Sequence, residues 1–147
     1  MGSNLSILND TPHTWLVKCS PTPIPDPFQL TDALLTTLLP LSASPSAAAI
    51  AAAKTLRNTL KSQEYYQITP GLDERWHEVS RTKPQHAHCV RLFPEGGQVV
   101  REEVWMTEIK SGGAPSAMST HRIKWWCENG ELKVTRFPAV GGGAGRE

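Results

Sequence analysis

Two short segments of alternating apolar and polar residues open the chain. Residues 5–9 and 14–20 have strand character, and Trp15 and Val17 share one face of the second segment. Residues 9–12 (Asn-Asp-Thr-Pro) separate them. Such residues favour turns, because Asn and Asp bond their own backbone and proline restricts φ. The pattern predicts a β-hairpin with one buried side.

A helical spacing of apolar residues follows the proline-rich connector. Asp26 and Pro27 form a typical helix start, an N-cap carboxylate before a proline whose missing N–H does no harm. Leucines then recur at positions 30, 34, 38 and 41, so the first helix is expected to end near Pro40. Ser44 begins a second, alanine-rich helix that runs to about Ser62.

Beyond the second helix the period changes from helical to two, with many aromatic and β-branched residues. The expected strands cover residues 64–69, 74–80, 88–93, 98–110, 119–127 and 131–137. Residues 129–130 (Asn-Gly) are the strongest hairpin signal in the chain. Pairing across this turn would bring Cys127 opposite Leu132 and bury Trp125 opposite Val134. The following residue, Trp126, would then lie on the polar face.

These elements predict an α+β fold. We expect an antiparallel β-sandwich-like or curled sheet with an inserted helical hairpin over about residues 27–62. Residues 1–138 are expected to form one β-rich domain. The glycine-rich tail, residues 139–147, is expected to be disordered because it has nothing to pack.

Composition narrows the function classes. The chain has 147 residues and a net charge of +1, with no long run of either sign, so nucleic acid is not expected as a partner. Its three cysteines are an odd number, which is typical of a reducing compartment. No secretory signal is recognisable, because polar residues interrupt the start of the chain. We therefore expect a cytoplasmic protein.

The first six residues, MGSNLS, match the N-myristoylation pattern, with the acceptor amine on Gly2 and a serine at position 6. The pattern has few defined positions, and a chain that begins Met-Gly-Ser can match it by coincidence. One myristoyl chain gives only marginal, reversible membrane binding. Residues 33–53 carry no charge and would be long enough to span a bilayer, but their two prolines favour a helical hairpin packed on the sheet.

Sites for metal binding and catalysis are weakly indicated. His86 and His88 fall two apart on one face of an expected strand, but no zinc-ligand spacing recruits further ligands, so solvent-facing histidines beside a buried Cys89 are favoured. A nucleophilic set can be composed from Cys89, His88 or His121, and Glu103, but no family signature supports it. We therefore predict no catalytic residue, no metal and no cofactor.

Five tryptophans offer another kind of site. Strand alternation predicts that Trp126 is exposed among Arg122, Lys124 and Lys133, where it would be a surface contact for a ligand. In a small β domain most tryptophans simply fill the core, and alternation predicts this for Trp15 and Trp125.

Residues 1–18, MGSNLSILNDTPHTWLVK, resemble the start of a group of small proteins of eukaryotic microbes. These proteins share a myristoylation-like Met-Gly, an Asn-x-Thr segment and a tryptophan before a Val-Lys strand. They also have an alanine- and glycine-rich middle and a strand similar to residues 88–91. The resemblance implies an N-terminally lipidated β-rich protein and transfers no catalytic residue. Prolines inside the alanine-rich region here argue against insertion of that region into a membrane.

Together these observations predict a non-enzymatic interaction protein that associates weakly with membrane lipid through myristoylation of Gly2 and binds another protein. The alternative is a soluble, lectin-like ligand-binding module that uses exposed aromatics. A metal-dependent or Cys/His enzyme is the third and least favoured hypothesis.

Overall fold

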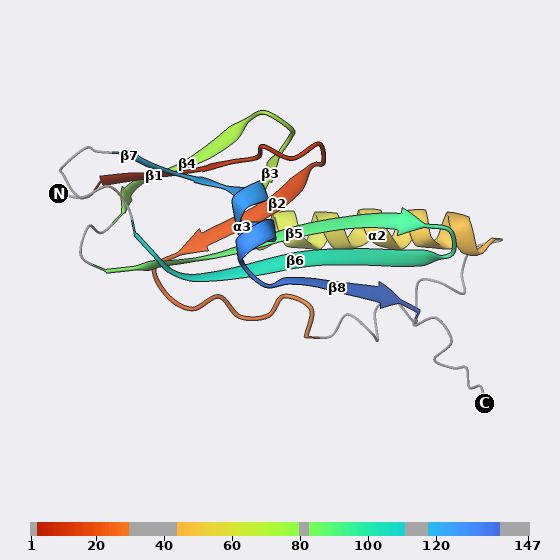
Figure 1. The fold of residues 1–147 in the computed structure, drawn as a ribbon. Coiled ribbons are helices and arrows are strands. Elements are labelled where there is room, and N and C mark those ends of the chain that lie inside the picture. The colour runs from red at the N-terminus through yellow and green to blue at the C-terminus, as the bar shows by residue number, and fades with distance from the viewer. Residues whose placement is uncertain (1–2, 30–43, 80–82, 111–117, 139–147) are drawn as a thin grey trace.

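The computed structural model describes residues 3–29, 44–79, 83–110 and 118–138, with no side-chain detail for residues 3, 78 and 79. In these segments the fold is mixed α+β, with two helices and eight strands in two sheets (Figure 1). The predicted fold class, a sheet-rich α+β protein with an inserted helix, is confirmed.

The larger sheet has five antiparallel strands built around a long hairpin. Its order is β3 (Tyr66–Ile68), β2 (Trp15–Ser20), β5 (Gln85–Glu95), β6 (Gln98–Ile109) and β8 (Leu132–Phe137). The β5 and β6 strands pair along their whole length and turn at Gly96 and Gly97. β2 borders only the first half of β5, since their pairing begins at Leu16 and Val90.

The smaller sheet has three strands in the order β4 (Asp73–Val79), β1 (Ser3–Leu8) and β7 (Met118–Arg122). β1 is antiparallel to β4 and parallel to β7. Leu5 and Ile7 of β1 are fully buried in a cluster with Ala87, Cys89 and Val104 of the larger sheet. The two sheets therefore share one apolar core, as in a sandwich.

The predicted hairpin of residues 5–9 and 14–20 is wrong, because β1 and β2 lie in different sheets. The connection between them is fixed by the side chain of Asn9, which is fully buried. Its Nδ2 donates to the carbonyls of His13 and Ile68, and its Oδ1 accepts from the Thr11 N–H and hydroxyl. These bonds tie the connection to β3 and direct the chain into the second sheet.

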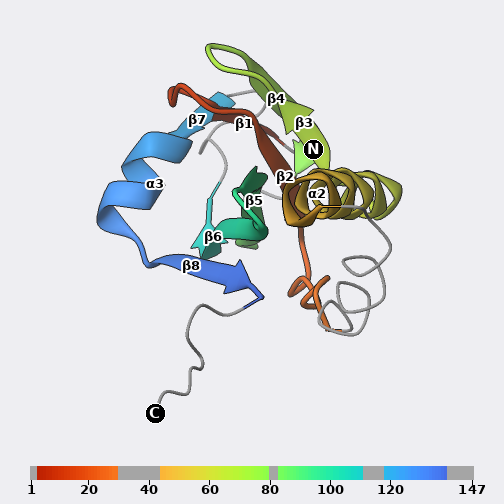
Figure 2. The same ribbon diagram turned by 90° about the vertical axis from the view of Figure 1, so that its right-hand side faces the viewer.

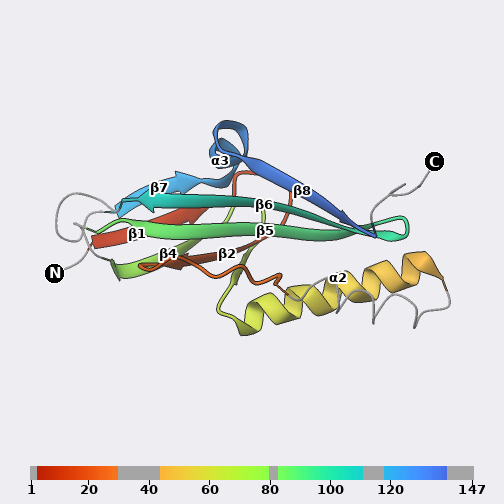
Figure 3. The same ribbon diagram turned by 90° about the horizontal axis from the view of Figure 1, so that it is seen from below.

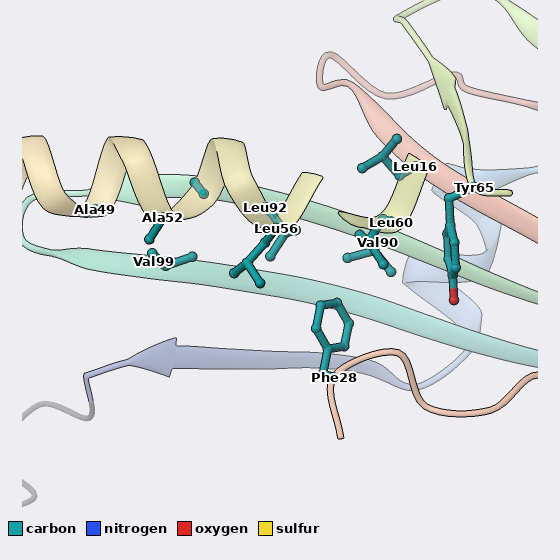
Figure 4. Packing of buried hydrophobic residues seen from close by; sticks show 11 residues of the cluster. Leu16, Phe28, Ala49, Ala52, Leu56, Leu60, Tyr65, Val90, Leu92 and Val99 are labelled. Carbon is teal, nitrogen blue, oxygen red and sulfur yellow. The ribbon is translucent and has the colours of Figure 1, made fainter. Parts of the chain in front are cut away.

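The second predicted helix is confirmed as α2 (Pro45–Ser62). Ser44 is its N-cap and accepts a hydrogen bond from the Ala47 N–H at 3.1 Å. Its buried face carries small side chains in its first half and Leu56 and Leu60 near its end, packed on β5 and β6 (Figure 4). The β5–β6 turn reaches the start of α2: a Cβ at Gly97 would lie 2.8 Å from Pro45 Cβ, so only glycine fits there.

The expected strand over residues 119–127 is correct only as far as Arg122. Residues from Ile123 to Asn129 form helix α3, which buries Ile123 and Trp126. The Asn-Gly pair at 129–130 ends this helix and does not make a hairpin. The Gly130 N–H donates to Trp126 O at 2.7 Å, and a Cβ at position 130 would lie 2.7 Å from that oxygen.

The two helices lie on opposite sides of the β5–β6 hairpin (Figures 2 and 3). The first helix of the predicted helical hairpin falls largely outside the described residues, and so does the predicted tail, 139–147. In the described segment that ends at residue 29, Asp26 Oδ1 accepts a hydrogen bond from the Phe28 N–H. No helix in the described segments is long and apolar enough to cross a membrane.

Candidate functional site

The most distinctive polar feature of the molecule is a buried cluster centred on His88. Its imidazole is fully buried, and both ring nitrogens have partners. His88 Nε2 lies 2.8 Å from Glu103 Oε1, and Nδ1 lies 2.7 Å from the Tyr65 hydroxyl oxygen. A carboxylate only accepts hydrogen bonds, so the ring donates from Nε2 and accepts the Tyr65 hydroxyl proton at Nδ1.

Strand register brings these side chains together. Alternation along β5 places His88 on the same face as Val90, toward α2. Glu103 of β6 is the partner of Val90, and Trp105 is the partner of His88. The rings of Trp105 and His88 stack with centroids 3.5 Å apart. Tyr65 follows α2 and contacts the imidazole edge-on.

Arg101 completes the cluster on β6. Its Nε lies 2.9 Å from Glu103 Oε2. This contact is an ion pair only, because Nε has no hydrogen-bond partner among the described residues. The guanidinium carbon lies 4.2 Å from the centroid of the Phe28 ring, in a cation–π contact. Phe28 thus covers the charged end of the cluster.

The electrostatics favour a neutral imidazole beside a charged carboxylate. Burial lowers the pKa of His88 and outweighs the pull of Glu103. Burial opposes ionisation of Glu103, but the hydrogen bond from His88 and the charge of Arg101 together hold its pKa below the usual value. Burial and the negative charges of Glu103 and Asp26 raise the pKa of Tyr65. Both ring nitrogens of His88 are therefore satisfied within the protein, and neither is open to a substrate.

Acidification is expected to lower the free energy of unfolding, beginning near the ordinary histidine pKa of about 6.5. Below that pH the unfolded chain protonates His88, while the folded state keeps it neutral. The unfolded state then binds more protons than the folded state, so the free energy of unfolding decreases as the pH is lowered. The lowered pKa of Glu103 adds a further loss at lower pH. Urea denaturation over a pH series measures the slope.

The His88→Gln variant is expected to show a shallower loss of stability with acidification than the wild type. His121 contributes in the same direction, because burial lowers its pKa too, so part of the slope remains. His77→Gln, which removes an exposed imidazole, is the matched control. Equal slopes for His88→Gln and the wild type would contradict this account of the cluster.

A pocket of about 330 Å³ adjoins the cluster. It lies between the connector that follows β2 and the end of α2, and it is lined by Lys18, Asp26 and Tyr65 among others. The Lys18 ammonium donates to the Gln63 carbonyl at 3.1 Å and lies 5.9 Å from the Tyr65 ring centroid. His88 is not among the residues that line this pocket, so the pocket does not expose the imidazole.

The fold brings His88 and Glu103 of the predicted nucleophilic set together but assembles neither that set nor a metal site in the described residues. His86 is half-buried, whereas His88 uses both nitrogens within the protein. No cluster of three possible ligands occurs in the described parts of the chain. Cys89 lies in the other core cluster, on the opposite face of β5 from His88, and burial raises its thiol pKa well above the usual value. The expected burial of Cys89 is confirmed, but the expectation that His88 faces solvent is wrong.

The predicted surface tryptophan is also misplaced. Trp126 is 2% exposed and Trp125 is 58% exposed, the reverse of the prediction. A helix places residues three apart on one face, so Trp126 joins Ile123 in the core while Trp125 turns outward with Arg122 and Lys124. A ligand site that uses the Trp126 ring is therefore excluded.

Gly2 lies outside the described residues. Ser6, which supplies the serine of the MGSNLS pattern, is buried, and its hydroxyl donates to Asp73 Oδ2 at 2.8 Å. This bond is the largest cause of the lowered pKa of Asp73. Ser6 thus has a structural role that would by itself explain its presence in the pattern.

The His88 cluster was only partly visible in the sequence. His88 and Glu103 appear there as members of a composed nucleophilic set, and nothing indicates Tyr65 or Arg101. The available signal is a pair of polar residues, His88 and Glu103, at inward positions of two strands. No protein-family model, curated protein or solved structure matches this chain.

Proposed function

We propose that the protein is a non-enzymatic interaction protein that is held weakly at the cytoplasmic face of a membrane by myristoylation of Gly2 and binds a protein partner there. The observation that carries this proposal is the position of β1. It begins at Ser3, directly after the acceptor glycine, and is the central strand of its sheet. Leu5 and Ile7 anchor it in the core. An acyl group on Gly2 would therefore leave the protein within one residue of a rigid strand.

The surroundings of the start of β1 suit such a group. Asn4 pairs with Met118 of β7, and the Met118 side chain is 41% exposed. An apolar side chain beside the attachment point gives an acyl chain a surface to lie against when it is not in a bilayer. Weak, switchable membrane binding is the expected consequence, because one myristoyl chain supplies only marginal affinity.

The closed state of the His88 cluster supports a non-enzymatic role. General acid–base chemistry requires a side chain within hydrogen-bond reach of the substrate. Glu103, His88 and Tyr65 direct their hydrogen bonds at one another and are buried. The cluster is better suited to holding strands β5 and β6 in register.

Gly2→Ala is expected to move the protein from the membrane fraction to the soluble fraction of eukaryotic cells, because alanine cannot accept the acyl group. The native protein is expected to lack Met1 and to carry an added mass of ~210 Da from the acyl chain. Membrane flotation and intact-mass measurement check the two results.

Ser3→Ala is the matched control, since it changes the neighbouring residue and keeps the acceptor glycine. Ser6→Ala is unsuitable, because it would also remove the bond to Asp73. A native protein with an unmodified N-terminus, or equal flotation of Gly2→Ala and Ser3→Ala, would end the membrane proposal.

A further inference from the structure

A second pocket, of about 470 Å³, lies at the edge of the larger sheet where β2 stops bordering β5. β5 continues past the first residue of β2 and runs beside α2 (Figure 1). Leu92 faces α2 while Arg91 and Phe93 alternate to the other face, so the pocket wraps around the strand edge. A volume of this size is typical of small-molecule sites.

The charge of this pocket is one-sided. Two arginines line it, Arg57 of α2 and Arg91 of β5, together with the polar residues His13 and Gln67. No Asp or Glu is among the described residues that line it. In the described segments the one carboxylate bound to either arginine is that of Glu102, whose Oε1 lies 2.9 Å from Arg91 Nε. Glu102 is not part of the lining.

Both arginines are held in place before any ligand arrives. Arg57 Nη1 donates to the Leu92 carbonyl at 3.1 Å. Arg91 is held by Glu102, and its guanidinium carbon lies 3.9 Å from the Phe93 ring centroid. A guanidinium has five N–H donors, and each of these contacts uses one. Preorganised donors lose little freedom when they bind an oxyanion, and charge-assisted hydrogen bonds are the strongest kind.

The lining also includes apolar residues, among them Leu16, Val90 and Phe93. Leu16 and Val90 are buried in the core cluster beneath α2. We propose that this pocket binds a small organic anion, with a carboxylate or phosphate group held by Arg57 and Arg91. The proposal does not rest on acylation of Gly2, since the pocket belongs to the folded domain.

Three probes of similar shape test the proposal on the full chain: benzoate, phenyl phosphate and benzyl alcohol, with binding followed by NMR titration. The two anions are expected to bind and to shift resonances of Arg57 and Leu92, with weaker binding at higher salt. Tighter binding of benzoate would identify a carboxylate ligand, and tighter binding of phenyl phosphate a phosphate ligand. The neutral alcohol is expected not to bind, because it offers no charge to the guanidinium groups.

Arg57→Gln is expected to weaken anion binding by about tenfold or more, the loss typical of one charge-assisted hydrogen bond. Lys54→Gln removes a positive charge from an exposed position on the same helix and is expected to leave binding unchanged. Should Arg57→Gln not fold by circular dichroism, Arg91→Gln takes its place with the same expected loss. Binding of benzyl alcohol as tight as that of the anions, no binding by any probe, or equal affinities for the arginine and Lys54 variants would overturn the proposal.

Discussion

Glu103→Leu is expected to lower the free energy of unfolding by about 3–5 kcal/mol, the range found when one partner of a buried ion pair is removed. The variant leaves the His88 Nε2–H without an acceptor and removes the carboxylate that faces Arg101. His88 is fully buried and cannot turn to water, and Arg101 keeps only 18% of its side chain exposed beside the Phe28 ring. Urea denaturation followed by far-UV circular dichroism measures the loss without relying on Trp105, whose fluorescence the substitution would itself change.

The neighbouring glutamate provides the control for this experiment. Glu102 points to the other face of β6, where it pairs with Arg91 and keeps 23% of its side chain exposed. The Arg91–Glu102 pair is only half-buried and both side chains still reach water, so Glu102→Leu is expected to cost less than Glu103→Leu. Similar losses for the two variants would show that the buried cluster has no special weight in the stability of the fold.

Trp126→Ala is expected to destabilise the protein by about 3–5 kcal/mol, the usual cost of truncating a buried tryptophan. The side chain is 2% exposed, belongs to the core cluster shared by the two sheets and stacks near His121 with ring centroids 5.6 Å apart. Removing the indole leaves a cavity under α3 that the neighbouring sheet cannot fill. The free energy of unfolding from urea denaturation gives the magnitude.

Trp125→Ala is the matched comparison, since it deletes the same side chain one position earlier. Trp125 is 58% exposed on α3, and surface substitutions of this kind usually change stability by less than about 0.5 kcal/mol. The pair of variants distinguishes the two conformations of this segment. A strand over residues 119–127 would bury Trp125 instead, so a larger loss for Trp125→Ala than for Trp126→Ala would contradict helix α3.

The sequence was sufficient to predict an element when the residues that begin it and the residues that form its buried face all lie within that element. Helix α2 is the clearest case: Ser44 caps the helix that Pro45 begins, and the buried positions recur every three or four residues up to Leu60. The β5–β6 hairpin is similar, because the glycines at its turn are adjacent in the chain. These elements could be predicted because every interaction that defines them is short in sequence.

The first part of the chain also contains a local hydrogen-bonded unit. Asn9, Thr11 and Trp15 form one hydrogen-bonded unit, in which the Trp15 indole N–H donates to the Thr11 hydroxyl at 2.9 Å and that hydroxyl donates to Asn9 Oδ1. The sequence indicated a turn there. The side-chain bond from Asn9 to the Ile68 carbonyl, 59 positions away, is what sends the two flanking strands into different sheets.

The sequence alone determined the strand-rich composition of the fold and the extent of α2, because period and capping are properties of neighbouring residues. It predicted one buried side for β2, whereas Leu16 on one face and Trp15 and Val17 on the other are all buried. Only the tertiary structure decided the conformation of residues 123–129, where apolar residues fit a strand face and a helix face equally well. The N–H of Lys124 finds its acceptor in Asp10, at 2.9 Å and 114 positions away. The His88 cluster has the same origin, since its members come from α2's end and two paired strands. Contacts between residues that are far apart in the sequence determine these features, so no local sequence pattern predicts them.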